Sequence, residues 1–253
     1  MDGRLPWLAL CATLLVAATP PKDIAFVECP IVRDTKTVPC WLAEHKGKLY
    51  YLGIQTDVSA EFNPPSLGHK VLVEGQVTDA PTICGGIVLK PVKVSIMQER
   101  ADDCNQLLPA DDRYDLTFTP PRPPGPSAGR LAFDYAPPPP APQPPFKPQS
   151  FDIHYDFNGT VGFSTPRLIQ PVLKYAREVN ARKIEITGLR GATRLDDGTL
   201  AIEDEAIAAR RANQIADLLK GVGLTSPTYV VVAKDKYQVG DWTTRRVTVV
   251  VSP

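Results

Sequence analysis

The pattern of hydrophobic and polar positions divides the chain into two parts with different periodicities. In the first part, from Asp23 to Phe118, short runs of β-branched and aromatic residues are separated by turn residues such as Asn63-Pro64-Pro65. Helical periodicity is nearly absent there. Five strands in roughly a hundred residues suit a small barrel or sandwich. The predicted strands are Ile24 to Val27, Val38 to Leu42, Leu49 to Ile54, Lys70 to Val77 and Ile87 to Met97.

After Ser150 the pattern alternates between strands and helices. Ser164-Thr165-Pro166 supplies a helix N-cap followed by proline in the first turn, and a second helix is expected from about Ile202 to Lys220. The fold class is therefore α+β, with a small all-β N-terminal domain and a βαβαββ C-terminal domain. The predicted strands of the second part are Phe151 to Phe157, Lys183 to Thr187, Tyr229 to Ala233 and Arg246 to Val251.

A proline-rich segment separates the two parts. Of the 27 prolines, 13 lie between Pro120 and Pro148. Proline lacks the N–H group and fixes φ, so this segment is expected to form an extended, semi-rigid tether. Docking of the tether through Leu131 to Tyr135 is the alternative. The expected domains are a β domain over 22–118, a linker over 119–150 and a C-terminal domain over 151–253.

The first eighteen residues have the pattern of a secretory signal peptide. Leu5 to Ala18 is apolar apart from Pro6 and Thr13, and it is shorter than the roughly 20 residues that a membrane-spanning helix needs. Cleavage is expected after Ala18, which leaves no transmembrane span. An uncleaved buried helix and a lipoprotein site at Cys11 are the alternatives. The expected location is the periplasm or the outer-membrane-associated cell envelope.

Cleavage leaves four cysteines, which in an exported protein indicate two disulfides. No pair has the CxxC spacing, so a zinc site has little support. Three connectivities are possible. The pairing Cys29 with Cys40 and Cys84 with Cys104 is expected, because each bond then closes a short local loop.

The balanced charge argues against a nucleic-acid partner, and the lack of known catalytic motifs favours a noncatalytic protein. Lys+Arg and Asp+Glu both number 28, so no overall basic field attracts nucleic acid or anionic lipid. The three histidines, His45, His69 and His154, have no HExxH context, and no GxSxG elbow or phosphate loop is present. No enzyme activity, cofactor or metal is predicted.

Four fragments of the second part, in their order and spacing, resemble the OmpA-like peptidoglycan-binding domain over about residues 151–253. They are Ile153-His154-Tyr155-Asp156-Phe157-Asn158, Ile184-Glu185-Ile186-Thr187-Gly188, Arg211-Ala212-Asn213-Gln214-Ile215 and Thr244-Arg245-Arg246-Val247. They match the family's "F-D-F-D/N" strand, its strand ending in glycine, its "R-A-x-x-V" helix and its "N-R-R-V" segment. In the first part, Gly68 to Val77 resembles, more loosely, a central strand of an OB-type barrel.

The OmpA-like resemblance implies noncovalent binding of a peptidoglycan stem peptide. Arg211 matches the family arginine that holds the carboxylate of the ligand, and Arg245, in the "N-R-R-V" segment, is a second candidate ligand-binding arginine. The family aspartate is missing three residues after Gly188. Three unmatched residues could supply its carboxylate: Asp196, Asp197 or Asp204. Without the resemblance, Arg210-Arg211 is typical of a solvated helix face, and Asp196-Asp197-Gly198 of an ordinary turn.

The sequence therefore predicts a noncatalytic envelope protein that binds peptidoglycan and tethers a β domain to the cell wall. Envelope proteins that contact the N-terminal domain are a second class of partner. The alternative keeps the OmpA-like fold without peptidoglycan binding, as a protein-protein contact module in an envelope assembly.

Overall fold

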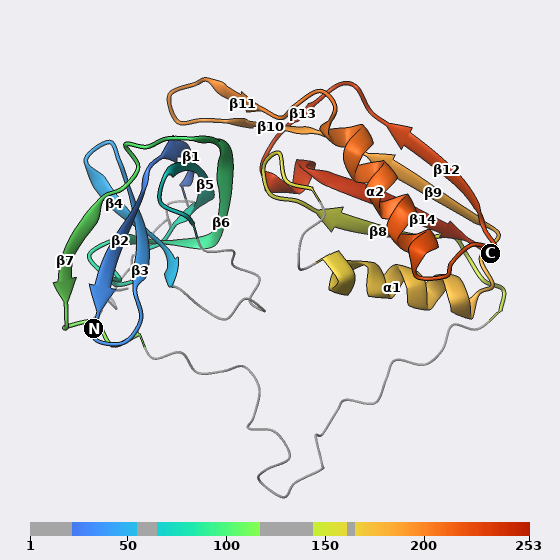
Figure 1. The fold of residues 1–253 in the computed structure, drawn as a ribbon, viewed down its shortest axis with the longest axis horizontal. Coiled ribbons are helices and arrows are strands. Elements are labelled where there is room, and N and C mark those ends of the chain that lie inside the picture. The colour runs from blue at the N-terminus through green and yellow to red at the C-terminus, as the bar shows by residue number, and fades with distance from the viewer. Residues whose placement is uncertain (1–21, 55–64, 117–143, 161–164) are drawn as a thin grey trace, which may run out of the picture.

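The computed structural model describes residues 22–54, 65–116, 144–160 and 165–253, which form two lobes (Figure 1). The expected signal peptide and most of the expected linker lie outside these ranges. In the described residues, no helix is long and apolar enough to cross a membrane. The predicted α+β class is confirmed, because the first lobe is built of strands and the second combines strands with two α-helices.

The N-terminal lobe is a seven-stranded sheet with the strand order β1-β5-β6-β4-β3-β2-β7. Its strands are β1 (Asp23–Glu28), β2 (Pro30–Thr35), β3 (Cys40–His45), β4 (Lys48–Ile54), β5 (His69–Val77), β6 (Ile87–Arg100) and β7 (Leu107–Asp111). All five predicted strands are present. The sequence analysis missed β2, where charged residues follow two apolar ones, and β7, which carries proline and aspartate.

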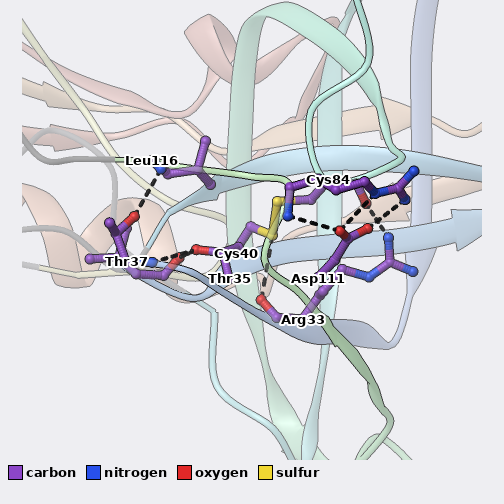
Figure 2. Close-up of a disulfide and its surroundings, with 9 residues drawn as sticks. Arg33, Thr35, Thr37, Cys40, Cys84, Asp111 and Leu116 are labelled. Carbon is purple, nitrogen blue, oxygen red and sulfur yellow. Dashed lines mark hydrogen bonds and ion pairs between the residues drawn. A yellow bond between two sulfur atoms is a disulfide. The ribbon is translucent and has the colours of Figure 1, made fainter.

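Two disulfides cross-link this lobe, but the expected pairing was wrong. Cys40 bonds to Cys84 and Cys29 bonds to Cys104, closing loops of 44 and 75 residues. Cys40 lies at the start of β3, and Arg33 on β2 donates a hydrogen bond to the carbonyl of Cys84 at 2.7 Å (Figure 2). Strand pairing brings together segments that are far apart in the sequence. Each disulfide joins two such segments and does not close a short local loop. Two disulfides fit an extracytoplasmic protein.

The C-terminal lobe contains a four-stranded sheet with the strand order β12-β9-β14-β8. Its strands are β8 (Gln149–His154), β9 (Lys183–Gly188), β12 (Thr228–Ala233) and β14 (Arg246–Ser252). The helices α1 (Thr165–Glu178) and α2 (Ile207–Gly221) pack on this sheet. The core residues alternate along β9 and β14: Ile184, Ile186, Val247, Val249 and Val251 are all fully buried.

Helix α2 begins later than predicted, because the segment before it forms a second, smaller sheet. Strand β10 (Gly191–Arg194) pairs with β11 (Leu200–Ile202) and with β13 (Gln238–Val239). Between β13 and β14 lies a short 3-10 helix, η2 (Trp242–Thr244). Two glycines allow close contacts between segments of this lobe. A Cβ at Gly188 would collide with the backbone of Ala208 on α2, and one at Gly191 would lie 2.7 Å from the side chain of Arg245.

Candidate functional site

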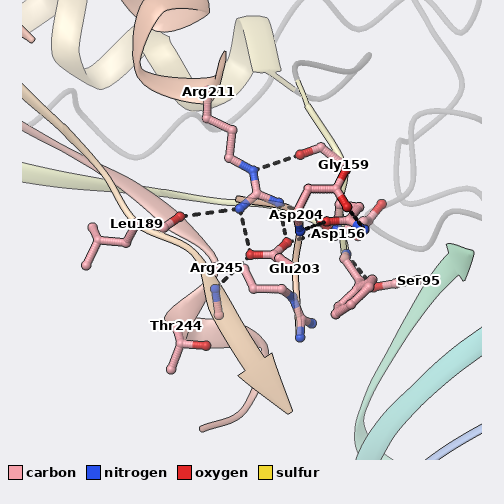
Figure 3. Close-up of polar contacts among 12 residues, drawn as sticks. Ser95, Asp156, Gly159, Leu189, Glu203, Asp204, Arg211, Thr244 and Arg245 are labelled. Carbon is pink, nitrogen blue, oxygen red and sulfur yellow. Dashed lines mark hydrogen bonds and ion pairs between the residues drawn. The ribbon is translucent and has the colours of Figure 1, made fainter. Parts of the chain in front are cut away.

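Arg211 lies on α2, with its side chain enclosed among polar groups from three other segments (Figure 3). Its guanidinium makes a bidentate ion pair with Glu203, at 3.0 Å from Nη1 to Oε2 and 2.6 Å from Nη2 to Oε1. It also donates to the carbonyls of Gly159, Leu189 and Asp156, at 2.7, 3.4 and 3.0 Å. An arginine has five N–H donors, so the protein itself accepts every one.

The Arg211–Glu203 pair lies in the interior of the lobe. Both side chains have 0% exposure, and the guanidinium lies 4.7 Å from the centre of the Tyr155 ring. Burial of Tyr155 raises the pKa of its hydroxyl, and the neighbouring positive charge of Arg211 partly opposes this shift. Glu203 also accepts hydrogen bonds from the backbone N–H groups of Asn158 and Gly191, at 2.9 and 2.8 Å. Both ions are therefore well satisfied in the absence of any ligand.

The expectation that Arg211 holds a ligand carboxylate from an open groove is corrected by this geometry. Its helical position was predicted correctly, but the side chain faces inward rather than into solvent. The carboxylate beside it comes from Glu203, which sequence reasoning missed.

Asp197 and Asp204 do not supply the missing carboxylate either. Asp197 accepts hydrogen bonds from the backbone N–H and the hydroxyl of Thr199, at 2.8 and 2.7 Å, and these bonds lower the pKa of its carboxyl. It therefore stabilises an ordinary turn. Asp204 lies near the Arg211 cluster, but it accepts from the side-chain amide of Asn158 at 3.3 Å and pairs with Arg210 at 3.1 Å.

Arg245 is buried at the contact between the two lobes. Its guanidinium forms an ion pair with Glu74 on β5 of the N-terminal lobe, and the two side chains are 0% and 5% exposed. The hydroxyl of Thr193 on β10 donates to Glu74 at 2.9 Å and accepts from Arg245 at 3.0 Å. The expected ligand-binding role of Arg245 is corrected, because this arginine joins the two domains.

Asp196 also contacts the N-terminal lobe, at the outer edge of β1. The backbone N–H of Ala25 donates to Asp196 Oδ1 at 3.1 Å, and the backbone N–H of Asp196 donates to the carbonyl of Ala25 at 2.8 Å. Its Oδ2 lies 3.6 Å from Nε2 of His45. The carboxylate that was expected to hold a ligand amine thus covers part of an edge strand.

A second group of interdomain contacts involves β6 and the loop that follows β8. The backbone N–H of Phe157 donates to the buried hydroxyl of Ser95 at 3.0 Å, and Gln98 donates to the carbonyl of Asn158 at 2.8 Å. Lys93 pairs with Asp156 at 2.6 Å. The two domains are therefore docked on each other through side chains and backbone groups of β6 and of this loop.

A pocket of about 310 Å³ lies along the interface and is lined in part by Trp242 and Arg194. Three aspartates at its wall already accept hydrogen bonds from the protein: Asp23 from Gln76, Asp196 from Ala25 and Asp241 from Thr243. Glu74, which also borders the pocket, is paired with Arg245. The four acidic side chains are thus already engaged within the protein.

Sequence reasoning missed the two acidic partners, Glu203 and Glu74. Glu74 carried a usable signal: it directly follows the buried run Val71, Leu72 and Val73 inside a strand, where an acidic side chain needs a partner. Glu203 lies in the segment that was predicted as the start of a helix, so its contact with Arg211 was not predicted.

Comparisons of the chain with protein-family models, with curated proteins and with solved structures found no match. The OmpA-like resemblance therefore rests on the sequence fragments alone.

Proposed function

We propose that this chain is a noncatalytic protein of the cell envelope whose OmpA-like C-terminal domain makes protein contacts instead of binding a peptidoglycan stem peptide. The observation that carries this proposal is the state of Arg211. All five of its donors are used inside the protein, and its side chain is fully buried. A ligand carboxylate would have to displace Glu203 and leave it buried without its partner.

The other candidate ligand residues support the same proposal. Arg245 and Asp196 both contact the N-terminal domain through Glu74 and Ala25. Residues expected to bind a cell-wall peptide are thus used for a contact between folded domains. The docked pair presents one composite surface to other envelope proteins, which is the role of a contact module.

The first experiment measures binding of the purified full chain to isolated peptidoglycan sacculi. The chain is expected to stay in the supernatant, while an OmpA-like domain that binds sacculi serves as the positive control. Specific retention of the chain would overturn the proposal, because binding would then occur without a free Arg211.

The second experiment tests the contact between the domains. A protease site is inserted into the proline-rich segment, and the cut protein is passed over a size-exclusion column. The halves are expected to elute together, and Arg245→Met is expected to separate them because it removes the partner of Glu74. The control variant, Arg210→Met, removes an exposed ion pair with Asp204. Separation of the halves in the unsubstituted chain would show that docking is too weak for the proposed role.

A further inference from the structure

Among the described residues, no strand pairs with the outer edge of the four-stranded sheet, and this edge lacks the features that normally prevent edge-to-edge pairing. Strand β12 lies at this edge (Figure 1) and has the sequence Thr-Tyr-Val-Val-Val-Ala. It contains no charged residue and no proline. Val230, Val231 and Val232 are 36%, 38% and 39% exposed.

The three other edge strands of the two larger sheets are protected. Asp196 covers the edge of β1 at Ala25. Strand β7 contains Pro109 and Asp111, and β8 contains Asp152. Proline and charged side chains on edges are the usual means of preventing unwanted strand pairing. The exposed valines of β12 are therefore exceptional among these four edges.

The register of β12 shows which backbone groups are free to pair. The N–H groups of Thr228 and Lys234 donate to the carbonyls of Arg182 and Gly188, at 2.8 and 3.0 Å. Because pairing with β9 is parallel, every second residue of β12 turns its N–H and C=O toward β9. The outward-facing groups belong to Tyr229, Val231 and Ala233.

These outward groups are self-complementary about Val231. We propose that β12 pairs antiparallel with β12 of a second copy of this chain, with Val231 facing Val231 of the partner across a two-fold axis. Tyr229 then faces Ala233 of the partner, so a large side chain meets a small one. Val230 faces Val232 of the partner in a pair without hydrogen bonds, where side chains approach closely. All three outward N–H groups find an acceptor.

The neighbouring registers of this antiparallel pair give less favourable residue pairing. Moving the axis toward Thr228 places Ala233 opposite Pro227, which has no N–H to donate. Moving it toward Ala233 places Tyr229 opposite Asp235, outside the strand. In the proposed register Lys234 faces Thr228, so no charge meets a like charge. An isologous contact of this kind closes on itself as a dimer and joins the two sheets into one.

This inference deepens the proposed role as a contact module by naming one partner, a second copy of the chain. The interdomain contacts described above do not involve β12. Loss of the dimer is therefore expected to leave both the sacculus result and the association of the cut halves unchanged, so failure of the two proposals can be distinguished.

The test is sedimentation of the full chain over a range of concentrations up to about 100 µM, where micromolar dimers are populated. The unsubstituted chain is expected to form dimers. Val231→Lys places two ammonium groups on the axis and should weaken the dimer at least about tenfold. Val231→Pro should have the same effect without breaking the fold, because the N–H it removes points away from β9. Ile202→Lys, at a 41% exposed position on β11, is the control and should leave the dimer intact.

Oxidation of Val231→Cys tests the register itself. Facing residues in a hydrogen-bonded pair have Cα atoms about 5.5 Å apart, which a disulfide can span. The Val231→Cys chain should form a covalent dimer linked through this position, whereas Ile202→Cys should not. A monomer at the highest concentration, a dimer that Val231→Lys leaves unchanged, or a failure of Val231→Cys to cross-link would each overturn the proposal.

Discussion

The ion pair between Arg245 and Glu74 joins the domains, and its removal should have effects that depend on which partner is lost. Glu74→Gln leaves a guanidinium buried without its counter-ion, and an arginine cannot release its proton to relieve this. Breaking a buried pair from one side costs about 3–5 kcal/mol in the free energy of unfolding. Arg245→Met should cost less, because Glu74 borders the interface pocket and keeps the hydrogen bond from Thr193.

The double variant Glu74→Met with Arg245→Met distinguishes two contributions to the free energy of unfolding: that of the ion pair itself, and that of a buried charge left without a partner. Replacing both ions by apolar groups of similar size is often close to neutral. We therefore expect the double variant to be more stable than Glu74→Met alone, and the cycle of Glu74→Met and Arg245→Met should give a coupling of at least about 2 kcal/mol.

The assay is urea unfolding of the full chain, followed by circular dichroism and by fluorescence. Glu185→Gln provides the control, because its pair with Lys183 is 42% and 46% exposed and should contribute less than about 0.5 kcal/mol. If Glu74→Gln cost no more than this exposed pair, the buried contact would not hold the domains together and the reasoning would fail.

Two further predictions concern the disulfides and pH. Replacing Cys40 and Cys84 by alanine should lower the free energy of unfolding by about 4 kcal/mol, because the bond closes a loop of 44 residues; recovery of a peptide linking Cys29 to Cys40 from the native chain would contradict the observed pairing. Burial lowers the pKa of His154, so the unfolded state binds more protons as the pH falls through the ordinary imidazole range, and stability should decrease there. The urea midpoint should fall between pH 7.5 and 5.5 by more than in His154→Gln, and equal slopes would rule out this source of pH dependence.

Local periodicity was sufficient to predict most of the fold. The apolar stripe on α1 and the alternation along β9 are set by neighbouring residues, and they bury Ile169, Val172, Ile184 and Ile186. The hairpin of β10 and β11 was missed because its strands have only four and three residues, and the turn between them contains Asp196 and Asp197. The disulfide pairing was wrong because it depends on which strands meet in space, and sequence spacing does not determine this.

The site was harder to predict, because the role of a charged residue depends on which partner the fold places beside it. The fragment around Arg211 indicated an arginine on a helix, and α2 carries it. Glu203 neutralises that arginine, so it is not available to a ligand. Arg245 is neutralised in the same way by Glu74, 171 residues away. The buried run before Glu74 indicates that this glutamate needs a partner, but no local pattern identifies Arg245 as that partner or pairs Glu203 with Arg211.

The Arg211–Glu203 pair also makes the binding of a ligand carboxylate at Arg211 unfavourable. A ligand carboxylate could at best replace the bonds that Glu203 already makes, so the exchange gains little for Arg211 itself. It would leave Glu203 buried with only the N–H groups of Asn158 and Gly191, a loss of about 3 kcal/mol or more. Such a cost weakens binding more than about a hundredfold relative to a site with a free arginine. The internal carboxylate of Glu203 thus competes with a ligand carboxylate for Arg211, and this competition supports the proposed contact function over binding of a stem peptide.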